Sequence, residues 1–183
     1  PTLSASPSID ALAEQFFNRP EPDYALGHGE TLIIQFKPES VDKYLQLLEG
    51  HATMTPVATD YHVYRLSDIH LTSQGLAGLK KVATFTLLVD DHTQARYNSS
   101  TSVVHFDTGL IAAFARALGG RKTTKDHYVV QPKNGSTQTL LDTIQGYGLP
   151  VHAIDVRTGF FVFDGRYRLP PALLNSTADR TVV

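Results

Sequence analysis

The stretch that decides the fold is Leu32-Ile33-Ile34-Gln35-Phe36-Lys37, which leads through Ser40 into an apolar-striped segment that ends at Gly50. At a distance of 96 residues, Tyr128-Val129-Val130-Gln131-Pro132-Lys133 leads through Ser136 into a similar segment that ends at Gly146. A β-branched and aromatic run followed by apolar residues at helical spacing predicts a strand and then a helix. The echo indicates an internal duplication. Chance similarity between two strand–helix units is the alternative, and both explanations stay open.

The rest of the chain predicts further elements on either side of these two units. Ser6 and Pro7 are typical of a helix start, and the following apolar residues run at helical spacing to Phe17. Strands are predicted from their alternation or their β-branched content, and a helix from its apolar face and closing Gly119-Gly120. The predicted strands are 60–66, 82–90, 101–106, 151–157, 160–163 and 166–169, with a polar turn at 91–100, a helix at 108–118 and a hairpin turn at Asp164-Gly165.

This order predicts an α+β fold, in which helices pack on one face of antiparallel sheet. One interpretation is a tandem duplication of an α-β-α-β-β unit. The other is a ferredoxin-like β-α-β-β-α-β order within residues 31–131, with further elements appended. The expected organisation is a helix and linker at 1–30, a first lobe at 31–107, a second lobe ending in a β-meander at 108–171, and a polar tail at 172–183.

Composition narrows the function classes. The chain has 183 residues, a formal charge of −2 and no cysteine. The missing cysteine excludes disulfides, thiolate metal sites and a cysteine nucleophile. The near-neutral charge argues against broad attraction to nucleic acid or to an anionic membrane.

No apolar run reaches the roughly 20 residues that span a bilayer, and no secretion signal is recognised at the start. We therefore expect a cytoplasmic protein, or a virion protein assembled in a host cytoplasm.

Three of the four asparagines, Asn98, Asn134 and Asn175, lie in N-x-S/T sequences. Without a targeting signal, these are interpreted as polar turns in a chain rich in serine and threonine. The two ends, residues 1–6 and 175–183, are short, polar and without an apolar stripe. Such ends are typical of termini that become ordered only against a neighbouring subunit.

The strongest catalytic or metal candidates are Asp90, Asp91 and His92, which follow a predicted strand on a polar turn. A carboxylate can orient a histidine and fix its tautomer, as a general base or a metal ligand requires. No established ligand spacing accompanies the three residues, and no metal or other cofactor is predicted.

A basic cluster of Arg116, Arg121, Lys122 and Lys125 surrounds Gly119-Gly120. Its composition is superficially that of a phosphate-binding loop. However, the glycines close a helix, whereas a phosphate loop must open one to direct backbone N–H groups at the anion. A solvated basic turn is the favoured interpretation, and contact with nucleic acid or an acidic partner is the alternative.

These observations lead to three functional hypotheses. The first is a non-enzymatic structural subunit of a large assembly, such as a capsid, neck or tail component of a virus or phage, which binds copies of itself or other subunits. The second is a nucleic-acid-binding or regulatory module that uses the basic cluster. The third is a small hydrolase or metal enzyme centred on Asp90, Asp91 and His92.

Overall fold

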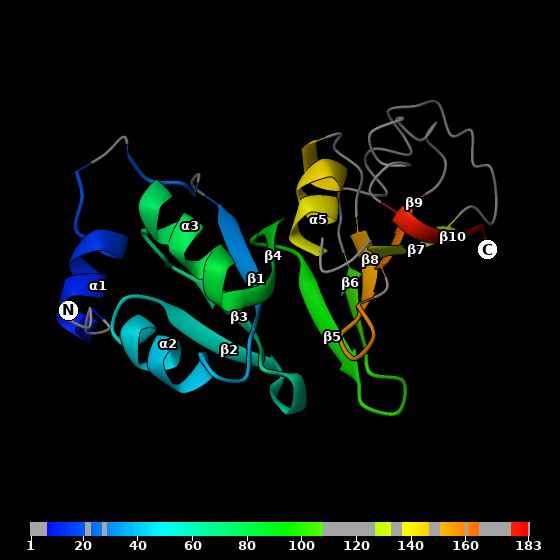
Figure 1. The fold of residues 1–183 in the computed structure, drawn as a ribbon, viewed down its shortest axis with the longest axis horizontal. Helices are drawn as coiled ribbons and strands as arrows, with labels where there is room; N and C mark the ends of the chain where they lie inside the picture. The colour runs from blue at the N-terminus through cyan, green and yellow to red at the C-terminus, as the bar shows by residue number, and fades with distance from the viewer. Residues whose placement is uncertain are drawn as a thin grey trace, which may run out of the picture. The chain divides into compact units, whose positions relative to one another are not determined.

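The structure is a computed structural model that describes residues 7–20, 23–26, 29–107, 127–132, 137–146, 151–159, 161–164 and 177–182. The chain divides into two compact units (Figure 1). Unit 1 comprises Pro1–Pro56 and His62–Asp91, and unit 2 comprises Val57–Tyr61 and His92–Val183. Each unit combines helices with antiparallel sheet, which confirms the predicted α+β class.

Unit 1 is a four-stranded antiparallel sheet covered by helices. The strand order is β2-β3-β1-β4, the order of a ferredoxin-like β-α-β-β-α-β fold. The elements are α1 (Ile9–Phe17), β1 (Glu30–Phe36), α2 (Val41–Leu48), β2 (Thr53–Ala58), β3 (Val63–Ser67), α3 (Ser73–Val82) and β4 (Ala83–Asp90). Between β2 and β3 the chain forms a short 3₁₀ helix, η1 (Thr59–Tyr61), which belongs to unit 2 together with the last two residues of β2.

The ferredoxin-like order is therefore present, but in Glu30–Asp90 rather than across residues 31–131. The sequence did not reveal α3, because Gly75 and Gly78 interrupt its apolar pattern and lower its helix propensity. It also did not reveal β2, which contains Pro56 and is mostly exposed or half-buried. Without these two elements, the sequence-based order was completed with residues that belong to unit 2.

The core of unit 1 lies between the helices and one face of the sheet. Leu32, Ile34 and Phe36 of β1 point into it. Leu12 and Phe16 of α1, Leu47 and Leu48 of α2 and Leu79 of α3 complete it. Ile33, on the opposite face of β1, is also fully buried, which explains why this strand is apolar without alternation. Each such side chain contributes roughly 1.5–3 kcal/mol of transfer free energy.

Helix α1 is attached to α3 by an unusually close contact. A Cβ atom added at Gly75 would lie 2.9 Å from the Cα and from the carbonyl oxygen of Phe16, and one at Gly78 would lie 2.5 Å from the Phe16 ring. Thr72 adds hydrogen bonds from its amide to the Phe16 carbonyl (2.7 Å) and from its hydroxyl to the Gln15 carbonyl (2.7 Å). The glycines of α3 thus make room for the end of α1.

Unit 2 is built around a six-stranded sheet of order β10-β7-β9-β8-β6-β5, in which all described pairs are antiparallel. Its described α-helix, α5, has Leu140, Leu141 and Ile144 buried. The elements are β5 (Gln94–Asn98), β6 (Val103–Asp107), β7 (His127–Pro132), α5 (Thr137–Gly146), β8 (Val151–Asp155), β9 (Phe161–Asp164) and β10 (Thr177–Val182).

The two units share an order of strands. Unit 1 reads β4-β1-β3-β2 across its sheet, and unit 2 reads β10-β7-β9-β8 before the added β6-β5 hairpin. The helix after the first strand begins at Val41 in unit 1 and at Thr137 in unit 2, again 96 residues apart. This agreement is what an internal duplication would produce, and it includes more elements than the repeated sequence. The duplication itself stays a prediction.

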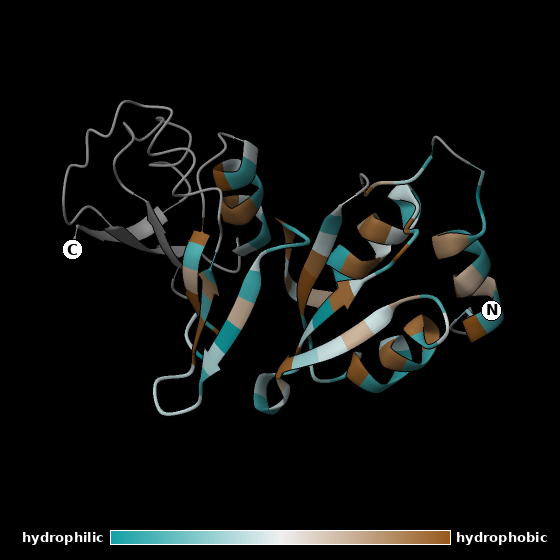
Figure 2. Cartoon of the chain, turned by 180° about the vertical axis from the view of Figure 1, so that it is seen from behind, coloured by the Kyte–Doolittle hydropathy of each residue, from teal (hydrophilic) through white to brown (hydrophobic). Residues whose placement is uncertain are grey.

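Several predicted segments differ from the structure. The polar turn expected at 91–100 contains strand β5, whose polar residues alternate with Ala95 and Tyr97 (Figure 2). The polar tail expected at 172–183 contains strand β10, paired with β7. The β5–β6 hairpin, placed in the first lobe by sequence, belongs to unit 2. The helix expected at 108–118, the Asp164-Gly165 turn and the strand expected at 166–169 lie wholly or partly outside the described residues.

One further property of the helices concerns membranes. Within the described part of the chain, no helix has both the length and the apolar character to cross a bilayer.

Candidate functional site

Asp90, Asp91 and His92 lie where β4 ends and the chain turns toward β5. The Thr31 hydroxyl donates a 2.6 Å hydrogen bond to Oδ1 of Asp91. The Asp91 amide donates to the Gly29 carbonyl (2.9 Å), and Nη2 of Arg65 donates to the Asp91 carbonyl (2.7 Å). Asp91 therefore connects β1, β3 and β4 through hydrogen bonds.

The three residues differ in their exposure to solvent. Asp91 and His92 are exposed and Asp90 is half-buried. Among the residues that the structure describes, no three histidine or acidic side chains come close enough together to hold a metal ion. The basic residues Arg116, Arg121, Lys122 and Lys125 lie outside the described residues, so the second predicted site has no described geometry.

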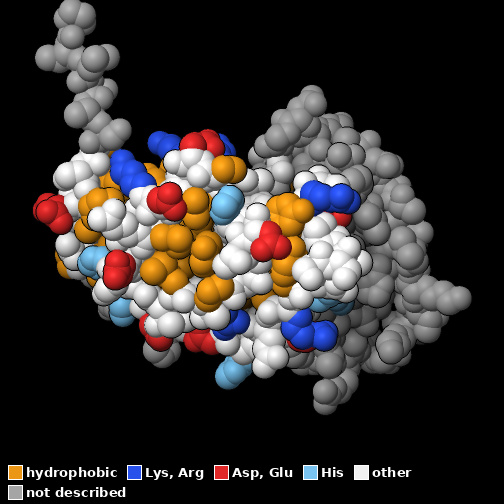
Figure 3. Space-filling view, turned by 90° about the horizontal axis from the view of Figure 1, so that it is seen from below, with side chains coloured by type: hydrophobic (Ala, Val, Ile, Leu, Met, Phe, Trp, Pro, Cys, Tyr) orange, Lys and Arg blue, Asp and Glu red, His pale blue; other side chains and the backbone are white. Residues whose placement is uncertain are grey.

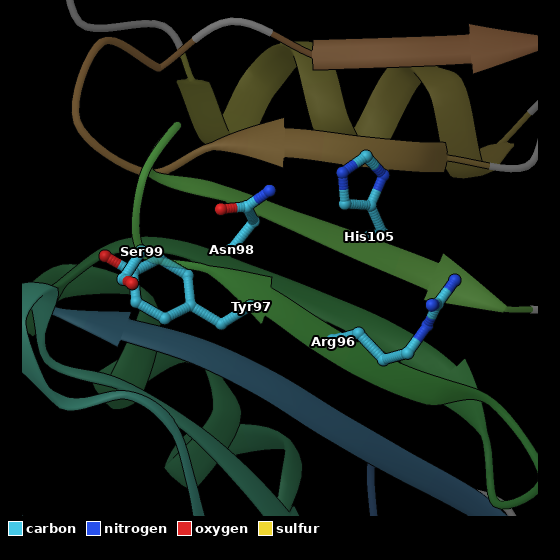
Figure 4. Close-up of a pocket in the computed structure, with 5 residues that line it drawn as sticks. All are labelled: Arg96, Tyr97, Asn98, Ser99 and His105. Carbon is cyan, nitrogen blue, oxygen red and sulfur yellow. The ribbon is translucent and has the colours of Figure 1, made fainter.

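A concave surface lies elsewhere, on the β5–β6 hairpin of unit 2 (Figure 4). It has a volume of about 500 Å³ and is open to solvent. The strands pair so that Arg96 lies opposite His105, and both side chains are exposed. The residues that line it are Arg96, Tyr97, Asn98, Ser99 and His105.

The charges of this surface are largely paired. Nε and Nη2 of Arg96 donate to the two carboxylate oxygens of Asp107, at 2.7 and 3.1 Å. Both side chains are more than half exposed, at 68% for Arg96 and 51% for Asp107, so the ion pair contributes little to stability. The other side chains that line the surface offer hydroxyl, amide and imidazole groups to a ligand; they are Tyr97, Asn98, Ser99 and His105.

The turn that follows β5 is held by Asn98. Its Oδ1 accepts a hydrogen bond from the Ser100 amide (3.0 Å), and its carbonyl accepts one from the Thr101 amide (3.3 Å). An asparagine that bonds the backbone two residues ahead is typical of a tight turn. In Figure 4 the Asn98 oxygen is directed toward the turn and its amide nitrogen away from it.

Tyr97 and Asp155 are the described groups whose pKa is clearly shifted. Burial, together with the negative charges of Asp60, Tyr61 and Asp155, raises the pKa of Tyr97 above its ordinary value. Burial also acts to raise the pKa of Asp155, but hydrogen bonds from Ser102, Arg157 and Thr158 outweigh it and lower that pKa. The bonds from Arg157 and Thr158 close the turn after β8, and the Ser102 hydroxyl donates from the turn before β6 at 2.8 Å.

The sequence does not predict the β5–β6 surface, because its polar composition predicts a turn at residues 91–100. The alternation of Gln94, Arg96 and Asn98 with Ala95 and Tyr97 is the signal that could have identified it.

Comparison with known proteins adds no relative. No protein-family model, no curated protein and no solved structure matches the chain.

Proposed function

We propose that this chain is a non-enzymatic subunit of a larger protein assembly, in which copies of the chain contact one another. The single observation that carries the proposal is an apolar surface on unit 1, which we name the α2–β2 surface. Figure 3 shows hydrophobic side chains gathered on this side of unit 1. Its members are Tyr44, Leu45, Ala52, Met54 and Pro56.

The residues of this surface are only partly covered within the chain. Tyr44, Leu45, Ala52 and Met54 pack against the core yet keep exposed area, and Pro56 is exposed. Contiguous apolar area of this kind on a folded domain is typical of a protein–protein contact. If a neighbouring subunit covered this surface, the burial of its remaining exposed apolar area would stabilise the contact.

The position of the surface favours a contact made by side chains. Strand β2 is an edge strand of the four-stranded sheet. Pro56 has no backbone N–H, so a neighbouring strand could not form a continuous ladder along β2. None of the five residues that define the α2–β2 surface carries a charge, so these residues of two copies can face each other without repulsion.

The assembly that the sequence led us to expect is a virus or phage particle, with this chain as a capsid, neck or tail component. That identification remains part of the proposal, and the α2–β2 surface supports its more general form, self-association. The cytoplasmic location expected from the sequence is likewise part of the proposal.

The test is the solution mass of the full chain, measured by light scattering over a range of concentrations. We expect a species larger than 20.1 kDa that grows with concentration. Pro56→Arg places a charge on an exposed member of the α2–β2 surface and should shift the protein toward monomer. Thr84→Arg adds the same charge at an exposed residue of the opposite edge strand β4, so it is the control and should leave the mass unchanged.

A wild-type protein that stays monomeric at every concentration would remove the proposal. If both variants dissociate equally, self-association would stand but the α2–β2 surface would not be its site.

A further inference from the structure

We propose that Asn98 is an acceptor for N-linked glycosylation and that the concave β5–β6 surface holds the first sugar of the glycan. The inference does not depend on self-association, but it competes with the cytoplasmic location proposed above, and a natural protein glycosylated at Asn98 would overturn that location. It begins from the acceptor sequence Asn98-Ser99-Ser100, since asparagine followed two residues later by serine or threonine is the pattern that oligosaccharyltransferases modify.

The acceptor pattern is more frequent in this chain than its serine and threonine content predicts. Serine and threonine make up 30 of the 183 residues, so roughly one asparagine in six would carry the pattern by chance. Three of the four asparagines carry it. The chain therefore has more acceptor sequences than its serine and threonine content explains.

The structure gives Asn98 the surroundings that a glycan requires. Asn98, Ser99 and Ser100 are all exposed, at the end of β5 and in the turn that leads to β6. The carboxamide oxygen is occupied by the Ser100 amide at 3.0 Å, and the nitrogen points away from the turn (Figure 4). A substituent on that nitrogen would leave the hydrogen bond that forms the turn intact.

The surface beside Asn98 matches the chemistry of a sugar. It is an open hollow of about 500 Å³, which is enough for one monosaccharide, and it is lined by polar groups. His105 extends over the same face as Asn98 (Figure 4) and offers ring nitrogens to hydroxyl or acetamido groups. The charge of Arg96 is balanced by Asp107, which suits a neutral ligand better than an anion.

The modification is a group transfer from a polyprenyl-diphosphate-linked oligosaccharide. Nδ2 of Asn98 forms a bond to the anomeric carbon of the first sugar. The bond from that carbon to the diphosphate oxygen breaks, and the lipid diphosphate leaves with the bonding electrons. One amide proton passes to the base of the transferase. The step requires passage of the chain through the compartment where this donor is found.

The acceptor is tested by directing the full chain into the secretory pathway of a eukaryotic cell and mapping glycopeptides by mass spectrometry. We expect Asn98 to be glycosylated in the wild type. Ser100→Ala should abolish modification at Asn98 because it removes the acceptor hydroxyl, whereas Ser99→Ala, one residue away in the same exposed turn, should retain it. An unmodified Asn98 in wild-type protein, secreted together with a glycosylated reporter protein, overturns the proposal.

The sugar-holding role has its own measurement. Trimming the glycan to one sugar should raise the thermal midpoint of the wild type above that of the Ser100→Ala protein treated in the same way. His105→Ala should abolish this difference without abolishing glycosylation. If the single sugar leaves the midpoint unchanged, the β5–β6 surface does not hold it.

Discussion

Gly75 packs directly against the backbone of α1, so a larger residue at this position should destabilise the protein. A methyl group at this position would lie 2.9 Å from the backbone of Phe16, which cannot move without displacing α1. We expect Gly75→Ala to lower the free energy of unfolding by about 1–2 kcal/mol, because overpacking outweighs the gain in helix propensity. Gly146→Ala, where no atom lies within 4 Å of the new methyl, is the control and should be neutral or stabilising. Urea unfolding of both variants measures the difference, and equal stability of the two would contradict the close contact.

The stability of the folded protein should depend on pH through the Asp155 carboxylate. Its pKa is lower in the folded chain than the ordinary value of an aspartate side chain. A group whose pKa is depressed by folding stabilises the protein above its unfolded pKa, and that contribution is lost as the pH falls through the folded pKa. We expect Asp155→Asn to reduce the stability difference between neutral pH and pH values below about 4. Thermal midpoints across this range check it, and an unchanged pH profile would show that the carboxylate is not stabilised by its turn.

At the scale of elements, Thr72 holds two helices at once. It caps α3 by accepting a 2.9 Å hydrogen bond from the Gly75 amide, and it donates to the Gln15 carbonyl of α1. We expect Thr72→Val, which keeps the shape and removes the hydroxyl, to cost about 1–3 kcal/mol of unfolding free energy. Ser8→Ala removes the exposed cap of α1 and should cost less, about 0.5–1 kcal/mol. Chemical unfolding compares them, and a cost for Ser8→Ala as large as that for Thr72→Val would refute the double role.

The elements that the sequence predicted well are those in which one local signal dominates. Strand β1 and helix α2 have continuous or periodic apolar residues and were located nearly to their ends. The sequence failed where tertiary structure replaces a local signal. Helix α3 is stabilised by its contact with Phe16 rather than by propensity, since Gly75 and Gly78 both disfavour a helix.

The candidate site was less predictable than the fold. Asp91 carries the residue type and position of a catalytic group, yet its contact with Thr31 comes from the neighbouring strand β1, 60 residues away in sequence. Sequence spacing alone cannot reveal such a contact. The β5–β6 surface depends in the same way on the register that places Arg96 opposite His105.

At the scale of the whole molecule, two segments with similar sequences lie in sheets that share an order of strands. Residues 32–50 and 128–146 resemble each other in sequence, and the strands around them occupy equivalent places in their sheets. Independent convergence would have to reproduce both the helix start and the order of four strands. The duplication hypothesis explains both with one event, and the β5–β6 hairpin is then the part of the sheet in unit 2 that has no counterpart in the sheet of unit 1.

Because each unit has its own sheet, we expect that one unit can be destabilised without an equal loss of stability in the other. Ile34 of β1 and Ile144 of α5 are both fully buried, one in each unit. Replacing either by alanine removes the same atoms and should cost about 2–5 kcal/mol, because a cavity is left behind. Local unfolding of the weakened unit then becomes easier, while the other unit keeps its own core. In hydrogen exchange, Ile34→Ala should accelerate the amides of β1, β3 and β4 more than those of β7 and β8, and Ile144→Ala should do the reverse. Equal acceleration of both sheets by each variant would show that the two units open only as one cooperative structure.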